Sequence, residues 1–87
     1  MSKTVTFKQL EKTLHAFGFV SQQGGSHVIF RHSKTGVVLT VPNTERTVRP
    51  IYVSTAARQI ANSGIATAST FETSLEKAAN NAGHPPV

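Results

Sequence analysis

Two kinds of hydrophobic spacing divide the N-terminal half of the chain. Near its start, apolar residues recur at intervals of three or four, at Phe7, Leu10, Leu14 and Phe17. This spacing predicts an amphipathic helix whose apolar stripe faces a core. Thr6 and Gln9 form a capping box at the start of this helix, and Gly18 is placed to end it in the left-handed conformation.

Strand-like runs follow the helix. Residues 19–23, 27–32 and 37–41 contain many β-branched or aromatic side chains, and turns that contain glycine separate them. Pro42 closes the third run, because proline has no N–H to donate to a strand ladder. The sequence therefore predicts three consecutive antiparallel strands.

Helical patterns return in the C-terminal half. Pro50 suits the first turn of a helix that stops near Gly64. Ser69 and Glu72 have the spacing of a second capping box, which predicts a short helix after them.

The order of these elements predicts an α+β fold: an α-β-β-β-α two-layer domain with helices on one face of the sheet and an appended C-terminal helix. We expect the core over residues 1–66, the appended helix over 67–83 and a flexible tail over 84–87. The 87 residues include no cysteine, and no apolar run is long enough to cross a membrane. One domain without disulfides, in the cytoplasm, is therefore the expectation.

Charge is the first feature that indicates a partner. Nine lysine and arginine residues oppose four glutamates, for a formal net charge of +5. All but one of the basic residues lie within residues 1–58. A positive field of this kind suits a polyanion such as nucleic acid, and a charge that serves only solubility is the alternative.

The sequence lacks the residues that several classes of enzyme require. The chain has no glycine-rich phosphate loop and no paired zinc-binding histidines. Four glutamates are too few for a two-metal nuclease, so we expect no metal and no cofactor. Ser26 and His27 are neighbours on a chain that we expect to be extended, so their side chains should point to opposite faces. This argues against a serine nucleophile that His27 activates.

Two histidines, His27 and His32, lie five positions apart on the second predicted strand. Odd spacing sends them to opposite faces of the sheet, so they are not expected to share a site. Val28 and Phe30 are on the face of His32, and this apolar face should point into the core. His27 is then exposed on the other face.

The turn before His27 favours an anionic ligand. Gly24 and Gly25 allow a phosphate to approach the backbone, with Ser26 beside them. An exposed imidazole can accept or give a proton near neutral pH, and RNA cleavage without a metal needs such a group together with cations. The spacing is equally compatible with an ordinary turn followed by a histidine that has no catalytic role.

The segment around this turn resembles a known family. A Gly-Ser-His run at residues 25–27 leads into the strand at 28–32, and it follows a Gly-Phe helix end within residues 14–19. This arrangement resembles the HicA (YcfA-type) toxins, and the resemblance covers about residues 6–66. It implies a fold similar to double-stranded RNA-binding domains and an mRNA-cleaving endoribonuclease of a type II toxin–antitoxin system. It also implies that His27 is the catalytic residue and that a HicB-type antitoxin covers it.

Basic residues complete the candidate site. We expect phosphate contacts from Arg31, Lys34, Arg46 and Arg49, while the backbone of Gly24 and Gly25, together with Ser26, shapes the phosphate approach.

The chain departs from the family pattern at one place. Many HicA-like sequences carry a basic residue and a histidine soon after the proline of the third strand, whereas Pro42 is followed here by Asn43, Thr44 and Glu45. A cation would then have to come from Arg46 or Arg49. The departure keeps two alternatives open, a non-catalytic RNA-binding module of the same fold and a protein-interaction domain.

Overall fold

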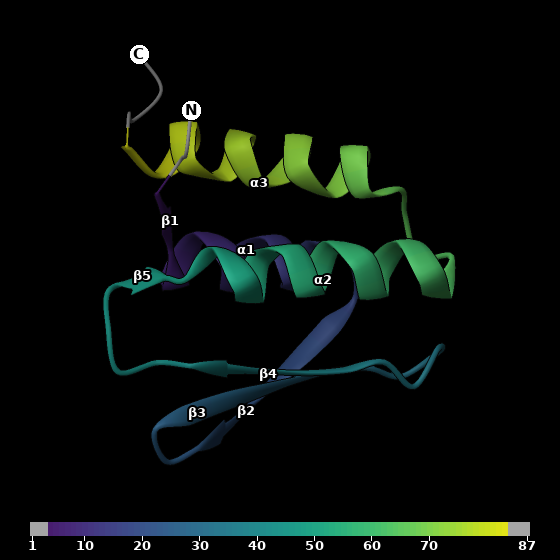
Figure 1. Ribbon diagram of the computed structural model, residues 1–87, viewed down its shortest axis with the longest axis horizontal. Helices are drawn as coiled ribbons and strands as arrows, with labels where there is room; N and C mark the ends of the chain where they lie inside the picture. The colour runs from purple at the N-terminus through teal and green to yellow at the C-terminus, as the bar shows by residue number, and fades with distance from the viewer. Residues whose placement is uncertain (1–3, 84–87) are drawn as a thin grey trace.

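Three helices lie on one side of a three-stranded antiparallel sheet (Figure 1). The structure is a computed structural model, and it describes residues 4–83. The tail expected over residues 84–87 lies outside the described residues. In chain order the elements are β1 (Val5–Thr6), α1 (Phe7–Ala16), β2 (Phe19–Gly24), β3 (His27–His32), β4 (Val38–Pro42), β5 (Thr47–Val48), α2 (Pro50–Ser63) and α3 (Ala68–Gly83). This order confirms the predicted α+β fold.

The central strand of the sheet is β3, with β2 and β4 on its two sides. Val28 and Phe30 are buried, while His27 and Arg31 are exposed. Side chains alternate between the two faces of a strand, so this pattern places the first pair under the helices and the second pair on the opposite face. We call the face away from the helices the outer face.

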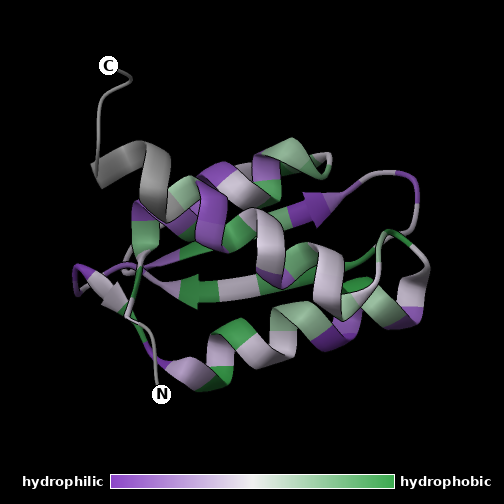
Figure 2. Ribbon diagram, turned by 90° about the horizontal axis from the view of Figure 1, so that it is seen from above, coloured by the Kyte–Doolittle hydropathy of each residue, from purple (hydrophilic) through white to green (hydrophobic). Residues whose placement is uncertain are grey.

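The core fills the layer between the sheet and the helices. Phe30 from β3, Leu10 and Leu14 from α1, and Ile60 from α2 have no exposed surface. Hydrophobic and hydrophilic segments alternate along the helices, as expected for helices that bury one side only (Figure 2).

The third helix lies over α1 and α2, on the side away from the sheet (Figure 1). Phe71 of α3 is fully buried, and its ring centroid is 5.9 Å from that of Phe17. The capping box predicted at Ser69 and Glu72 is wrong, because α3 begins earlier. The hydroxyl oxygen of Thr67 accepts a hydrogen bond from the backbone N–H of Thr70 at 3.0 Å, so Thr67 caps the helix.

Two strands of only two residues each are absent from the predicted order. In the structure, Val5 of β1 pairs with Val48 of β5, and both are buried. Beside this pair, the N–H of Phe7 donates to the carbonyl oxygen of Arg46 at 2.8 Å. The N-terminal segment therefore anchors the loop between β4 and α2.

A buried glutamine joins α1 to α3. The side-chain oxygen of Gln9 accepts from the N–H of Thr6 at 3.2 Å, and the Thr6 hydroxyl accepts from the N–H of Gln9, which confirms the predicted capping box. The Gln9 amide nitrogen also donates to the carbonyl oxygen of Leu75 at 2.7 Å. One side chain thus caps one helix and bonds to another.

Replacing Gln9 by Ala should lower the free energy of unfolding by about 1–3 kcal/mol, because it removes two hydrogen bonds of a buried side chain. Urea unfolding followed by circular dichroism measures the change. Gln59→Ala is the matched control, because Gln59 is exposed on α2, and a change within about 0.5 kcal/mol is expected there. Equal stability of the two variants would contradict the role given to Gln9.

Candidate active site

His27 is the first residue of β3 and is exposed on the outer face of the sheet. No helix of residues 4–83 covers this face (Figure 1). The Cα partners of His27 are Gly24 on β2 and Pro42 on β4. Because one neighbour has no side chain and the other has a short ring, a ligand can reach the imidazole from the open side.

A serine contacts one side of the His27 ring. The hydroxyl oxygen of Ser26 lies 3.2 Å from Nδ1 of His27. The expectation that these neighbours point to opposite faces is wrong, because Ser26 belongs to the turn, where side chains do not alternate as they do in a strand. With Nδ1 engaged, Nε2 is the ring nitrogen that can exchange a proton with a ligand.

Hydrogen bonds to backbone carbonyl oxygens hold the turn in place, and one of them comes from the Gln23 side chain, whose amide nitrogen donates to the carbonyl oxygen of Gly25 at 2.9 Å. Gly25 has a φ of +74°, which glycine adopts without strain, and an added Cβ would meet nothing within 4 Å. The N–H of Asn43 donates to the carbonyl oxygen of Ser26 at 2.9 Å, so the turn is tied to the end of β4. The space above Gly25 is therefore open to a ligand while the turn itself is fixed.

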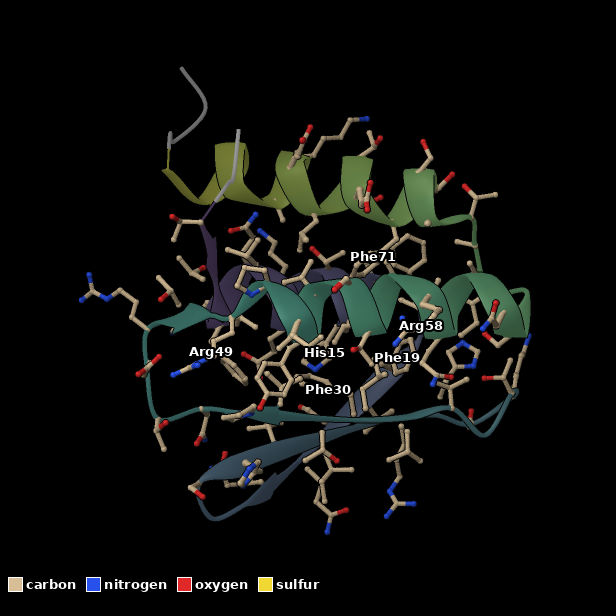
Figure 3. All side chains as sticks on the ribbon, viewed as in Figure 1. His15, Phe19, Phe30, Arg49, Arg58 and Phe71 are labelled. Carbon is tan, nitrogen blue, oxygen red and sulfur yellow. The ribbon has the colours of Figure 1, made fainter. Side chains whose placement is uncertain are left out.

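A hollow of about 280 Å³ begins at Pro42, the cross-strand neighbour of His27. The loop after β4, strand β5 and the start of α2 form its walls, and Arg49, Tyr52 and Glu45 line it. Arg49 stands where β5 leads into α2 (Figure 3). The hollow and the imidazole therefore lie at the same end of the sheet.

The other three predicted cations, Arg46, Arg31 and Lys34, do not line this hollow. Arg46 is exposed in the loop after β4, near the hollow but outside its lining. Arg31 is on the outer face two outward positions along β3, about 13 Å away at roughly 3.3 Å per residue. Lys34 follows β3 in the next loop, at the opposite end of the sheet. His27 and the turn at residues 24–26 thus lie at the same end of the sheet as Arg49, whereas Lys34 lies at the opposite end and Arg31 lies toward it.

His32 points toward the helices, and its contacts are structural. Its Nε2–H donates to the carbonyl oxygen of Phe17 at 3.1 Å, and Nδ1 accepts from the hydroxyl of Thr35 at 3.0 Å. Gly18 has a φ of +95°, which favours glycine, and an added Cβ would also make a tight contact, 3.2 Å from Nε2 of His32. The imidazole therefore fastens the end of α1 to the loop between β3 and β4.

His15 is exposed on α1, as expected, although its Nε2 also lies 3.1 Å from the hydroxyl oxygen of Ser21. Within residues 4–83, no three side chains of His, Asp or Glu are grouped so that they could hold a metal ion. The helices in this part of the chain are too short or too polar to span a membrane.

The HicA toxin family of bacterial toxin–antitoxin systems matches residues 7–61, more than half of the chain. The chain belongs to the HicA toxin family. The match runs from the start of α1 into α2, and it includes the whole three-stranded sheet and His27. No curated protein and no solved structure matches the chain. Membership confirms the resemblance, and it implies a toxin with an antitoxin partner and RNA as its substrate.

In this HicA toxin the structure adds two residues to the candidate site. Asn43 ties the turn to β4, and Tyr52 lines the hollow with Arg49. The spacing of hydrophobic residues does not indicate either one, because Asn43 contacts the turn through its backbone N–H and Tyr52 reaches the hollow only when α2 folds back over the end of the sheet.

The two strand histidines of this HicA toxin should differ in their effect on stability. His32→Ala removes two hydrogen bonds and a ring contact with Phe19, whose centroid is 5.0 Å away, so the free energy of unfolding should fall by about 1–3 kcal/mol. His27→Ala should change it by less than about 0.5 kcal/mol, because the side chain is exposed. Urea unfolding of both variants is the measurement, and the reverse order would show that His27 is the structural histidine.

Proposed function

We propose that this toxin is a metal-independent endoribonuclease that cleaves mRNA in the cytoplasm, with His27 as its proton-transfer residue, and that a HicB-type antitoxin neutralises it. The observation that carries the proposal is the position of His27. The imidazole is exposed on the outer face, Ser26 engages Nδ1, and the turn beside it leaves room for a phosphate.

The proposed reaction is an attack within the RNA strand. The 2′-oxygen of a ribose forms a bond to the adjacent phosphorus while the bond from phosphorus to the 5′-oxygen breaks. Nε2 of His27 accepts the proton of the 2′-hydroxyl. The leaving 5′-oxygen takes its proton from water, because the described outer face offers no second histidine. The hydrogen bond with Ser26 holds the ring in one orientation through the reaction.

Cations must balance the negative charge that grows on the phosphate oxygens. Arg49 lines the hollow at the end of the sheet where His27 lies, and Arg46 is exposed in the loop between β4 and β5. We assign these two arginines to the phosphates nearest the cut, in place of the histidine that many family members carry after the proline. Arg31 and Lys34 are assigned to phosphates farther along the RNA.

A second candidate function is RNA binding without cleavage. It is favoured by the residues after Pro42, where Asn43, Thr44 and Glu45 supply neither a histidine nor a cation. Glu45 even lines the hollow beside Arg49 and reduces its positive charge. The two functions differ in whether the purified protein cuts the RNA that it binds.

The purified protein should cleave RNA in excess EDTA, and His27→Ala should lower the cleavage rate by about 10²–10⁴-fold, the usual contribution of a general base. His15→Ala is the matched control, because His15 is an exposed histidine on α1, and it should keep the parent rate. Activity that disappears in EDTA and returns with magnesium would contradict metal independence. RNA that the parent binds but does not cut would favour the second candidate.

Affinity for RNA should come mainly from the four assigned cations. Replacing Arg31, Lys34, Arg46 and Arg49 by Gln should weaken binding and flatten its salt dependence, by about 0.7 in the log–log slope for each contact that is lost on single-stranded RNA. Lys77→Gln removes one positive charge from an exposed position on α3, away from the sheet, and should leave the slope unchanged. An unchanged slope in the four-residue variant would mean that the basic charge serves only solubility.

A further inference from the structure

The hollow beside Arg49 contains more than phosphate binding requires. Tyr52 and Glu45 line it together with Arg49, and Tyr52 is the only aromatic residue in this lining. The Tyr52 side chain packs against the hydrophobic core and is half-buried, so part of it stays accessible. Glu45 is exposed in the loop between β4 and β5. An aromatic ring, a carboxylate and a guanidinium therefore line one small space.

The hollow lies within reach of RNA at His27. Pro42 lines it and is the Cα partner of His27 on the neighbouring strand, and neighbouring strands are about 4.8 Å apart. Because β4 is an edge strand, no further strand of this sheet stands between Pro42 and the rest of the hollow. A nucleotide next to the cut can therefore cross Pro42 and place its base in the hollow.

The sheet itself has no ring on which that base could stack. Sheets that bind RNA bases present aromatic side chains for this purpose. The two phenylalanines of this sheet, Phe19 and Phe30, are buried, and the outward positions of β2, β3 and β4 carry no Phe, Tyr or Trp. Among these strands and the hollow beside them, only Tyr52 supplies an accessible aromatic side chain.

The volume of the hollow, about 280 Å³, suits one base. Pockets that bury a drug-sized ligand measure about 300–1,000 Å³, so a space just below this range fits a single planar ring system rather than a longer segment of RNA. Arg49 precedes α2, which begins with Pro50 and has no side-chain cap. The guanidinium and the positive end of the helix dipole therefore attract the phosphate of the nucleotide whose base fills the hollow.

Glu45 indicates which base fills the hollow. A carboxylate repels phosphates, so a surface that binds only the RNA backbone gains nothing from it. Its two oxygens accept hydrogen bonds and donate none, and they suit a group that presents two donors side by side. Guanine has such a pair on its Watson–Crick edge, N1–H and N2–H. Adenine, cytosine and uracil each place an acceptor beside a single donor group.

We propose that the hollow is a base-binding pocket for an unpaired guanine next to the cut, with Tyr52 stacked on the base and Glu45 accepting from its N1–H and N2–H. The inference rests on the proposed function, because that function brings RNA to His27. It adds a base preference, since phosphate contacts are the same for every RNA sequence, whereas Tyr52 and Glu45 contact the base.

The test measures RNA binding in the His27→Ala background, where the RNA stays intact. The probes are short oligouridine RNAs whose central nucleotide is guanine, adenine, cytosine or uracil. Fluorescence anisotropy gives the four dissociation constants at one salt concentration. The guanine probe should bind at least about fivefold more tightly than the other three, the lower limit for a bidentate pair of hydrogen bonds to a base edge.

Two substitutions in this background separate base choice from stacking. Glu45→Gln should remove the preference for guanine, so that the four probes bind equally. Tyr52→Leu keeps an apolar contact with the core but loses the ring, and it should weaken binding of the guanine probe by at least about fivefold. Tyr52→Phe restores a ring and should recover most of that affinity. Glu72→Gln is the matched control, because Glu72 is exposed on α3, and it should keep the guanine preference.

Equal affinity for the four probes before any change at Glu45, or a guanine preference that persists after Glu45→Gln, would overturn the inference. Full affinity in the Tyr52→Leu variant, shown to be folded by circular dichroism, would overturn it too and leave the hollow to a protein partner. A parent protein that binds the guanine probe selectively but does not cut it contradicts the proposed chemistry alone, so failure of the pocket and failure of the proposed function give different results.

Discussion

The alternation of side chains along β3 is the constraint on which the site depends. This central strand must bury Val28 and Phe30 under α1 and α2, and Phe30 has no exposed surface at all. A shift of one residue would exchange the two faces of the strand and move His27 and Arg31 into the core. Burial of an unpaired arginine costs far more than the loss of a hydrophobic contact, so the core fixes the orientation of the candidate site.

The two ends of β3 use the same residue type in opposite ways. At one end His32 has both ring nitrogens bonded within the protein and lies against Gly18, whose φ of +95° favours glycine. At the other end His27 has only Nδ1 engaged, by Ser26, beside a turn that leaves open space. The first imidazole is part of the scaffold, and the second is free to act on a ligand.

Local signals in the sequence predicted much of the fold. The capping box of Thr6 and Gln9, the left-handed Gly18, the helix end near Gly64 and Pro50 at the first turn of α2 act within a few residues, and all four are confirmed. The cap of α3 was misplaced because Ser69 and Thr67 are both suitable caps, and the choice between them depends on how Phe71 packs against α1.

The candidate site was less predictable, because it forms between distant segments. The hollow needs β5 and α2 to fold over the end of β4, and the two-residue strands that anchor this loop have no periodicity to detect. The contact between Ser26 and His27 depends on turn geometry, which alternation rules do not describe. The spacing of residues left the role of His27 open, and the family match supports a toxin without identifying the residue that acts.

The central claim is that RNA binds at the end of the outer face where His27 lies. Titration of ¹⁵N-labelled His27→Ala protein with a short RNA, followed by amide chemical shifts, tests it most directly, because this variant should bind without cutting. We expect the largest shifts at Gly25, Ser26, Asn43 and Arg49. Shifts confined to the exposed faces of α1 and α3, with the amides around residue 27 unchanged, would contradict it.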